Sequence, residues 1–183
     1  MKLLIILTGL PGTGKTILAQ KIGKDLCVAT LGRDYSIKES MFDTLGFGAD
    51  REWSKKLGRA SYDVLFKVLD GVMLGGQPVI VESNFTMQAQ PSFVELIQRH
   101  GYKSLLVNII TDDNTRKQRL IDRVKRGERH PGHSEVFTGG IMPNDPTENL
   151  QLPGNTVEID TTSFGETEYA TFREQIRAYL SKN

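Results

Sequence analysis

The sequence has 183 residues, 23 of them Lys or Arg and 22 Asp or Glu, with a formal net charge of +1. This length suits one domain with a real hydrophobic core, and a charge so near neutral argues against a protein that holds long nucleic acids electrostatically. The single cysteine, Cys27, excludes an internal disulfide, and its apolar neighbours predict a buried thiol in a reducing compartment.

The apolar run at residues 3–7 is shorter than the ~7–15 residues of a signal-peptide hydrophobic region, and it leads into a glycine-rich loop instead of a cleavage site. No apolar run approaches the ~20 residues that span a bilayer. We therefore expect a cytoplasmic protein without a membrane segment.

Short apolar runs alternate along the chain with longer amphipathic stretches. The runs predict strands at 3–7, 27–31, 79–81, 105–110 and 156–159, and the stretches predict helices at 15–25, 52–74, 88–99, 113–126 and 166–181. Apolar runs without polar alternation are typical of strands buried on both faces, as in a parallel sheet. The alternation indicates an α/β fold with helices on both faces of the sheet, in a single domain over residues 1–183.

The loop between the first strand and the first helix matches G-x-x-x-x-G-K-T in every fixed position. Its glycines let successive main-chain N–H groups surround a phosphate, and the following helix adds its positive end. Lysine then supplies a charge for the β- and γ-phosphates, and the last hydroxyl is a ligand for Mg²⁺. The sequence therefore predicts ATP and Mg²⁺ binding by Gly9, Leu10, Pro11, Gly12, Thr13, Gly14, Lys15 and Thr16, with Lys15 also catalytic.

The chain has no N-K-x-D guanine-specifying segment, which argues against a GTPase. It also has no room for a second, helical domain, which argues against a ring-forming ATPase. Three further places carry a resemblance: Arg33-Asp34, the segment 82–85, and the arginine-rich run 116–133. Together with the loop they resemble the compact P-loop kinases that include chloramphenicol phosphotransferase, the zeta-toxin kinases, and gluconate, shikimate and adenylylsulfate kinases. The resemblance implies a three-layer P-loop NTPase fold, with a five-stranded parallel sheet in the order 2-3-1-4-5 and an arginine-containing lid.

Asp34 follows the second strand, at the sheet edge where ligands bind in such folds. The resemblance to chloramphenicol phosphotransferase implies that Asp34 orients an acceptor hydroxyl or takes its proton. The alternative is a helix N-cap, since residues 36–42 look helical, although Ser36 is better placed for that role. Relatives often carry an arginine shortly after this aspartate. Here Arg33 precedes it and Lys38 follows it, so the cation on the acceptor side is not assigned.

Glu82 ends the third apolar run, where a carboxylate of the Walker B type would hold a Mg²⁺-bound water. We therefore expect Thr16 and Glu82 to serve the metal. Glu82 could equally face the acceptor, or be a surface charge at the strand end. Asn84 and Phe85 continue this edge and are expected to line the acceptor pocket.

Arg116, Arg119, Arg123 and Arg126 follow three- and four-residue steps, which places them along one side of a helix. Such a run is usually a solvated face, but the resemblance implies a lid over the nucleotide, where arginine can bind phosphate oxygens and stack on the base. We expect Arg123 near the base, Arg126 and Arg129 near the transferring phosphate, and the first two arginines at the surface.

The segment 127–154 is rich in Gly, Pro and His and longer than a usual connection, so we expect a lid with a short helix near 146–150. His130 and His133 make a poor zinc site and suit a role in this lid. The segment 160–163 either passes the adenine edge, as the resemblance implies, or caps the last helix.

These features predict transfer of the γ-phosphoryl group of ATP to a hydroxyl of a small molecule. One alternative is a kinase for the 5′-hydroxyl of a polynucleotide or nucleotide, and another is a non-enzymatic binding module switched by ATP. The segment 41–59 is expected to cap the acceptor pocket, with Phe42, Phe47 and Trp53 as apolar candidates.

Overall fold

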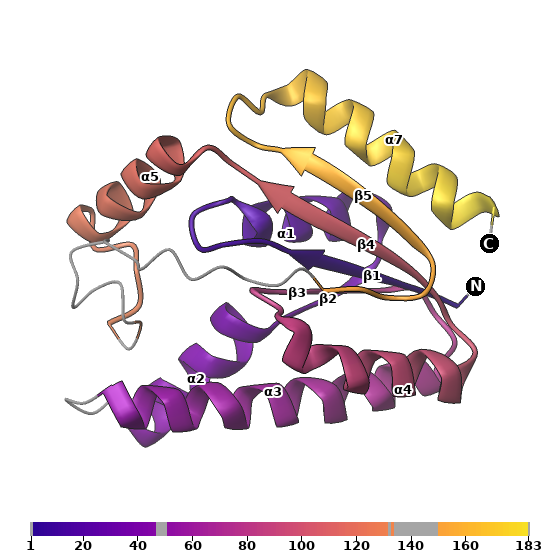
Figure 1. Ribbon diagram of the computed structural model, residues 1–183, viewed down its shortest axis with the longest axis horizontal. Helices are drawn as coiled ribbons and strands as arrows, with labels where there is room; N and C mark the ends of the chain where they lie inside the picture. The colour runs from indigo at the N-terminus through magenta and orange to yellow at the C-terminus, as the bar shows by residue number, and fades with distance from the viewer. Residues whose placement is uncertain (1, 47–50, 132, 134–149, 183) are drawn as a thin grey trace.

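The computed structural model describes residues 2–46, 51–131, 133 and 150–182 (Figure 1). Five parallel strands form one sheet in the order β2-β3-β1-β4-β5, as predicted. The strands are β1 (Leu3–Thr8), β2 (Ala29–Gly32), β3 (Val79–Ser83), β4 (Lys103–Ile110) and β5 (Asn155–Asp160). The architecture is therefore that of a P-loop NTPase.

Helices cover both faces of the sheet (Figure 1). They are α1 (Lys15–Leu26), α2 (Glu39–Leu45), α3 (Arg51–Leu74), α4 (Gln90–His100), α5 (Asp113–Lys125) and α7 (Glu166–Lys182), with a short π-helical segment η1 (Arg33–Lys38) and a 3-10 turn η2 (Met87–Ala89). Helices α3 and α4 pack on one face and α1 and α7 on the other. Among the described residues, no helix is both long and apolar enough to cross a bilayer.

The central strand β1 explains why the first apolar run shows no polar alternation. Leu4 and Ile6 belong to the core beneath α3 and α4, whereas Leu3, Ile5 and Leu7 belong to the core beneath α1 and α7. All five side chains are buried. Since a fully buried side chain of this size contributes about 1.5–3 kcal/mol, both faces of the strand stabilise the sheet and fix the loop that follows it.

Two predictions about local structure are wrong. Helix α1 continues to Leu26, and Cys27 follows it as a left-handed cap residue with φ 54°, so β2 begins only at Ala29. The Cys27 thiol is consequently exposed and not buried. Helical structure also begins earlier than residue 36, because η1 starts at Arg33, directly after β2. Phe47 and most of the expected lid, including the short helix near 146–150, lie outside the described residues.

Candidate active site

The glycine-rich loop connects the carboxyl end of β1 to the first turn of α1. Gly12 and Gly14 have φ angles of 90° and 83°, which is the left-handed region that favours glycine. The Thr13 hydroxyl donates a 2.9 Å hydrogen bond to the carbonyl oxygen of Leu10 and closes the turn. The Lys15 amine donates to the same oxygen at 3.3 Å. The loop thus has the folded form of a phosphate-binding loop.

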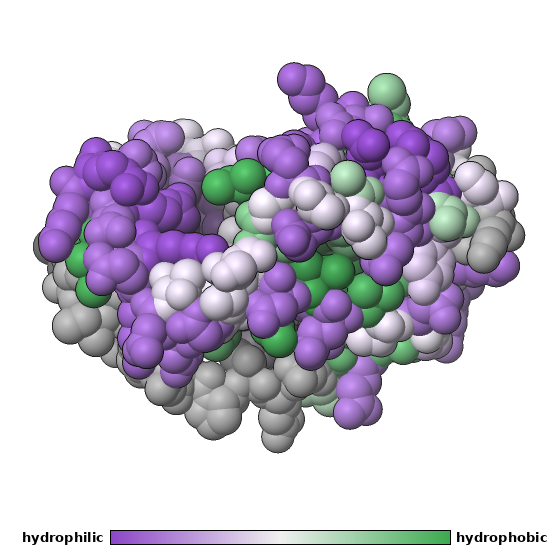
Figure 2. Space-filling model, turned by 90° about the horizontal axis from the view of Figure 1, so that it is seen from above, coloured by the Kyte–Doolittle hydropathy of each residue, from purple (hydrophilic) through white to green (hydrophobic). Residues whose placement is uncertain are grey.

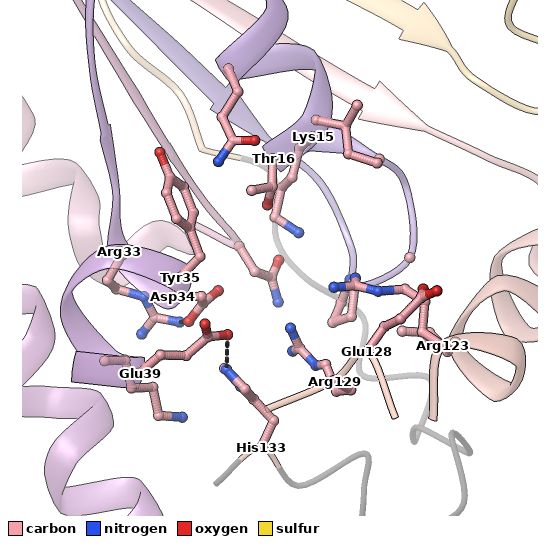
Figure 3. A pocket seen from close by; sticks show the side chains of 18 residues that line it. Lys15, Thr16, Arg33, Asp34, Tyr35, Glu39, Arg123, Glu128, Arg129 and His133 are labelled. Atoms are coloured by element: carbon pink, nitrogen blue, oxygen red, sulfur yellow. Dashed lines mark hydrogen bonds and ion pairs between the residues drawn. The ribbon is translucent and has the colours of Figure 1, made fainter. Parts of the chain in front are cut away.

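A pocket of about 400 Å³ opens beside this loop. Its walls come from the loop, from η1 and the start of α2, and from α5 and the residues after it. Figure 3 shows Lys15 and Asp34 pointing toward the cavity from different elements, with Arg129 entering from the far side. Seen from above, hydrophilic side chains gather at the end of the molecule that carries α5 (Figure 2). The structure therefore brings the predicted phosphate-binding and acceptor-side residues into one polar cavity.

Lys15 is 7% exposed, although it carries an amine. Burial lowers the pKa of Lys15, while the carboxylates of Glu82 and Asp34 oppose that effect. A compact cation in a largely desolvated site is suited to bind phosphate oxygens, and the nearby carboxylates favour its charged form.

Glu82 pairs in the sheet with Leu7 of β1 and with Gly32 of β2, and its side chain is completely buried. The surface-charge alternative is therefore wrong, because β3 runs on to Ser83 and encloses the carboxyl group. One oxygen, Oε2, accepts a 3.2 Å hydrogen bond from Thr16, and the other, Oε1, has no partner among the described residues. Burial raises the pKa of Glu82 to about 7.

This pair of side chains fits a magnesium ion. Mg²⁺ binds to oxygen ligands, commonly one or two carboxylates together with waters and substrate phosphates. Glu82 offers a buried oxygen without a protein partner, and the Thr16 hydroxyl lies against it at the end of the phosphate loop. Bound Mg²⁺ would also compensate the charge of a carboxylate that is costly to bury.

Asp34 lies inside the first turn of η1, and the residue at the helix start is Gly32. The N-cap alternative is therefore excluded. Burial alone would raise the pKa of Asp34, but the charges of Arg33 and Lys15 hold it below the usual value. The Arg33 guanidinium contacts Asp34 Oδ1 at 2.6 Å. Asp34 is thus an ionised carboxylate in the wall of the cavity.

Two arginines of α5 are more buried than the sequence predicted. Arg116, expected at the surface, is 2% exposed, and it donates to the Pro11 carbonyl oxygen at 3.4 Å and to Asp113 at 3.0 Å. Arg119, also expected at the surface, is half-buried and donates to the Thr161 carbonyl oxygen at 2.7 Å. The reason is that α5 packs against the loop and the end of β5, which the sequence alone does not reveal.

The other arginines of this run divide between the pocket and the solvent. Arg123 and Arg129 line the pocket with Lys15. Arg126, expected near the transferring phosphate, is not brought there, because it directly follows α5 and its 57% exposed guanidinium binds Glu128 at 2.7 Å and 2.9 Å.

The residues after α5 reach across to α2. His133 lies 2.8 Å from a carboxylate oxygen of Glu39, and His130 lies 3.0 Å from one of Asp43. The buried ring of Phe42 is stacked on His130, with ring centroids 5.7 Å apart. Glu39 and His133 both line the cavity, so their contact closes one side of it.

A second pocket, of about 320 Å³, adjoins the first, since Gly14 and Ile17 line both. The Thr161 hydroxyl donates to the Thr13 carbonyl oxygen at 2.8 Å, which ties the segment after β5 to the phosphate loop. The second pocket is lined by Arg119, Phe164 and Tyr169, whereas Arg123, which we expect near the base, lines the first pocket. Phe164 and Tyr169 belong to no sequence motif, so sequence reasoning does not single them out.

A family model described as an AAA domain matches residues 4–139 of the chain. The solved structure of a candidate kinase from Chloroflexus aurantiacus j-10-fl is 29% identical, with a TM-score of 0.86 and coverage of 97% of each chain. No curated protein matches the sequence.

Two more distant structures share the fold. One is a sugar kinase from Janibacter sp. HTCC2649, with 13% identity, a TM-score of 0.57, and coverage of 99% of this chain and 95% of the other. The second is the Mycobacterium tuberculosis APS kinase in complex with AMPPNP and APS, with 12% identity, a TM-score of 0.60 and 98% coverage of both chains. With its phosphate loop, sheet order and kinase neighbours, the chain belongs to the AAA domain family and to the small P-loop kinase group within that fold.

Proposed function

We propose that the protein is an ATP-dependent phosphotransferase that moves the γ-phosphoryl group to a hydroxyl of a small, hydrophilic acceptor. One observation carries the proposal: Lys15 of the phosphate loop and the ionised Asp34 line the same cavity. Phosphoryl transfer needs little from a protein beyond positioning and charge stabilisation, and these two groups supply both.

The two adjoining pockets support a path for the nucleotide. Its phosphates would lie on the main-chain amides of the loop, with Lys15 on the β- and γ-phosphates. The base would occupy the second pocket, between Arg119 and the wall that contains Phe164. Arg123 and Arg129 line the first pocket and would face the phosphates, where a guanidinium can bind two oxygens at once.

Thr16 and Glu82 would hold the metal directly or through its waters. When bound, Mg²⁺ supplies charge neutralisation at the β- and γ-phosphates. Asp34 would accept the hydrogen bond of the acceptor hydroxyl, align it, and take its proton as the phosphoryl group leaves the nucleotide. The contact of His133 with Glu39 would keep water away from this end of the cavity.

The cavity wall also supports a hydrophilic acceptor. On the acceptor side it is formed by Arg33, Asp34, Tyr35, Lys38, Glu39 and Asn84, of which Tyr35 alone carries a large apolar ring. Polar groups that converge in this way select ligands rich in hydrogen-bonding groups.

The test is a screen of hydroxylated metabolites, nucleosides and aminoglycosides for ATP consumption above the acceptor-free rate. Asp34→Asn should bind AMPPNP within about twofold of the wild type and lose ~10²–10⁴ of the transfer rate, the range of general base catalysis. Asp63→Asn, an exposed carboxylate on α3, is the matched control.

Two outcomes would count against the proposal. Transfer confined to the 5′-hydroxyl of oligonucleotides would favour a polynucleotide kinase. Slow ATP hydrolysis that Asp34→Asn leaves unchanged, with no acceptor phosphorylated, would favour an ATP-switched binding module.

A further inference from the structure

We propose that Arg33 is a positioning residue for Asp34, and that Tyr62 and Ser83 hold Arg33 in this role. The inference rests on the proposed function, because it assigns Arg33 to the carboxylate that would orient the acceptor. Arg33 could either position Asp34 or bind an anionic acceptor directly, and we assign it to the first role.

The guanidinium of Arg33 makes two polar contacts along its edges and one cation–π contact through its face. Its Nη2 lies 2.6 Å from Asp34 Oδ1, and its Nε donates to the Ser83 hydroxyl at 2.8 Å. The ring of Tyr62 covers the face, with Cζ 4.1 Å from the ring centroid. The Arg33 side chain is only 11% exposed, so a cation–π contact here is stronger than at an open surface.

The groups around Arg33 are themselves fixed. The Tyr62 hydroxyl donates to the Asn84 carbonyl oxygen at 3.0 Å, which ties α3 to the segment after β3. Ser83 is completely buried at the end of β3, where it pairs with Thr8 of β1. Arg33 is therefore held by the sheet on one side and by the long helix α3 on the other.

The contact between Arg33 and Asp34 is unusual for two adjacent residues. In a regular helix, neighbours in sequence do not face each other. The pair stands at the start of the π-helical segment η1, and π-helical turns occur frequently at functional sites. Arg33 binds Oδ1, so Oδ2 is the oxygen left to meet an acceptor hydroxyl.

Other charged groups also face Asp34 and must be separated from the effect of Arg33. Lys15 comes from α1, Lys38 from η1 and His133 from the segment after α5, and the buried Glu82 comes from β3. Arg33 differs from these because one nitrogen of its planar guanidinium contacts the carboxylate while another is held by Ser83, so that its direction is fixed as well as its charge.

The first experiment follows the side-chain carboxyl carbon of Asp34 by ¹³C NMR during a pH titration of the nucleotide-free protein. The resonance is assigned by its loss in Asp34→Asn. Arg33→Gln should raise the apparent pKa of Asp34, because the adjacent cation that favours the ionised carboxylate is lost. Arg33→Lys should recover part of that shift, and Arg99→Gln, an exposed arginine of α4, should leave the titration unchanged.

The second experiment measures Mg²⁺-dependent ATP hydrolysis, with water as the acceptor, together with the AMPPNP dissociation constant. Arg33→Gln should lower kcat by roughly tenfold or more and change AMPPNP binding by no more than about twofold, since the phosphate loop is intact. Guanidinium chloride at millimolar concentration should partly rescue Arg33→Ala. Tyr62→Leu should behave as a weaker version of Arg33→Gln, and Tyr62→Phe, which keeps the ring, should stay closer to the wild type.

If Arg33→Gln does not fold, as judged by circular dichroism, Ser83→Ala and Tyr62→Leu become the deciding variants for both measurements. An unchanged Asp34 titration together with unchanged kcat overturns the proposal. An unchanged titration with a raised KM for an anionic acceptor also overturns it and assigns Arg33 to the substrate. The titration does not depend on catalysis, so a failure of the proposed function would appear separately, as ATP hydrolysis that Asp34→Asn leaves unchanged and that phosphorylates no acceptor.

Discussion

Gly12 of the phosphate loop lies against Arg116 of α5, so that a Cβ on Gly12 would stand 2.8 Å from the Arg116 carbonyl oxygen. The same Cβ would stand 3.1 Å from Cγ of Leu120. Helix α5 is therefore packed directly on the phosphate loop. Any side chain at Gly12 must push the loop and α5 apart, because the nearest atom belongs to the main chain of Arg116 and cannot rotate away.

This relationship predicts different costs for two glycine substitutions in one loop. Gly12→Ala and Gly14→Ala both place alanine at positive φ, which costs about 1–2 kcal/mol. Only Gly12→Ala also overpacks, since nothing lies within 4 Å of a Cβ on Gly14. Urea unfolding without nucleotide should show Gly12→Ala to be less stable by a further ~1–3 kcal/mol. Equal losses in both variants would argue against a tight contact between loop and helix.

Lys15→Ala should weaken AMPPNP binding by roughly tenfold to a hundredfold, the equivalent of one charge-assisted hydrogen bond. The reason is that Lys15 is the buried cation of the loop. Lys24→Ala, an exposed lysine later in α1, is the matched control. Isothermal titration calorimetry measures both, and equal affinities for the two variants would contradict the assignment.

Arg119 and Arg123 should differ in what they bind. Arg119→Ala should weaken AMPPNP binding by about tenfold while leaving inorganic tripolyphosphate unaffected, because Arg119 lines the second pocket. Arg123→Ala should weaken both ligands, because Arg123 lines the pocket beside the loop. Competition against a fluorescent ATP analogue measures the four affinities. If Arg123→Ala weakened AMPPNP binding alone and Arg119→Ala weakened the binding of both ligands, the base would lie beside Arg123 instead.

The buried carboxyl of Glu82 should make stability depend on pH in metal-free buffer. Its pKa is about 7 when folded against an ordinary value of 4.5, so the folded protein keeps a proton that the unfolded chain releases. Protonated Glu82 therefore contributes fully below pH 4.5, and that contribution is lost as the pH rises through 7. The difference corresponds to about 3 kcal/mol.

Glu82→Gln should remove this dependence, since glutamine carries no charge. Comparing urea unfolding at pH 5 and pH 8 in EDTA should show a larger loss of stability in the wild type than in the variant. The same substitution should raise the Mg²⁺ concentration that ATP hydrolysis requires. If the two proteins lose stability in parallel and need the same Mg²⁺, Glu82 is not the buried metal-side carboxylate.

Much of the fold follows from local patterns in the sequence. Continuous apolar runs such as 3–7 predict strands buried on both faces, and in the structure both faces of β1 are buried. The phosphate loop can be identified because its chemistry depends on residue types at fixed spacing, which a sequence shows directly. The position of Asp34 after the second strand likewise follows from the order of elements along the chain.

What the sequence did not decide is which way several polar side chains face. Arg116 and Arg119 belong to a stripe that helical periodicity identifies, but only the packing of α5 against the loop shows that this stripe is turned inward. The burial of Glu82 depends on pairing with strands far away in sequence. Periodicity assigns residues to the same side of an element, whereas the neighbour on that side, and with it burial, charge and pKa, is set by contacts between distant segments.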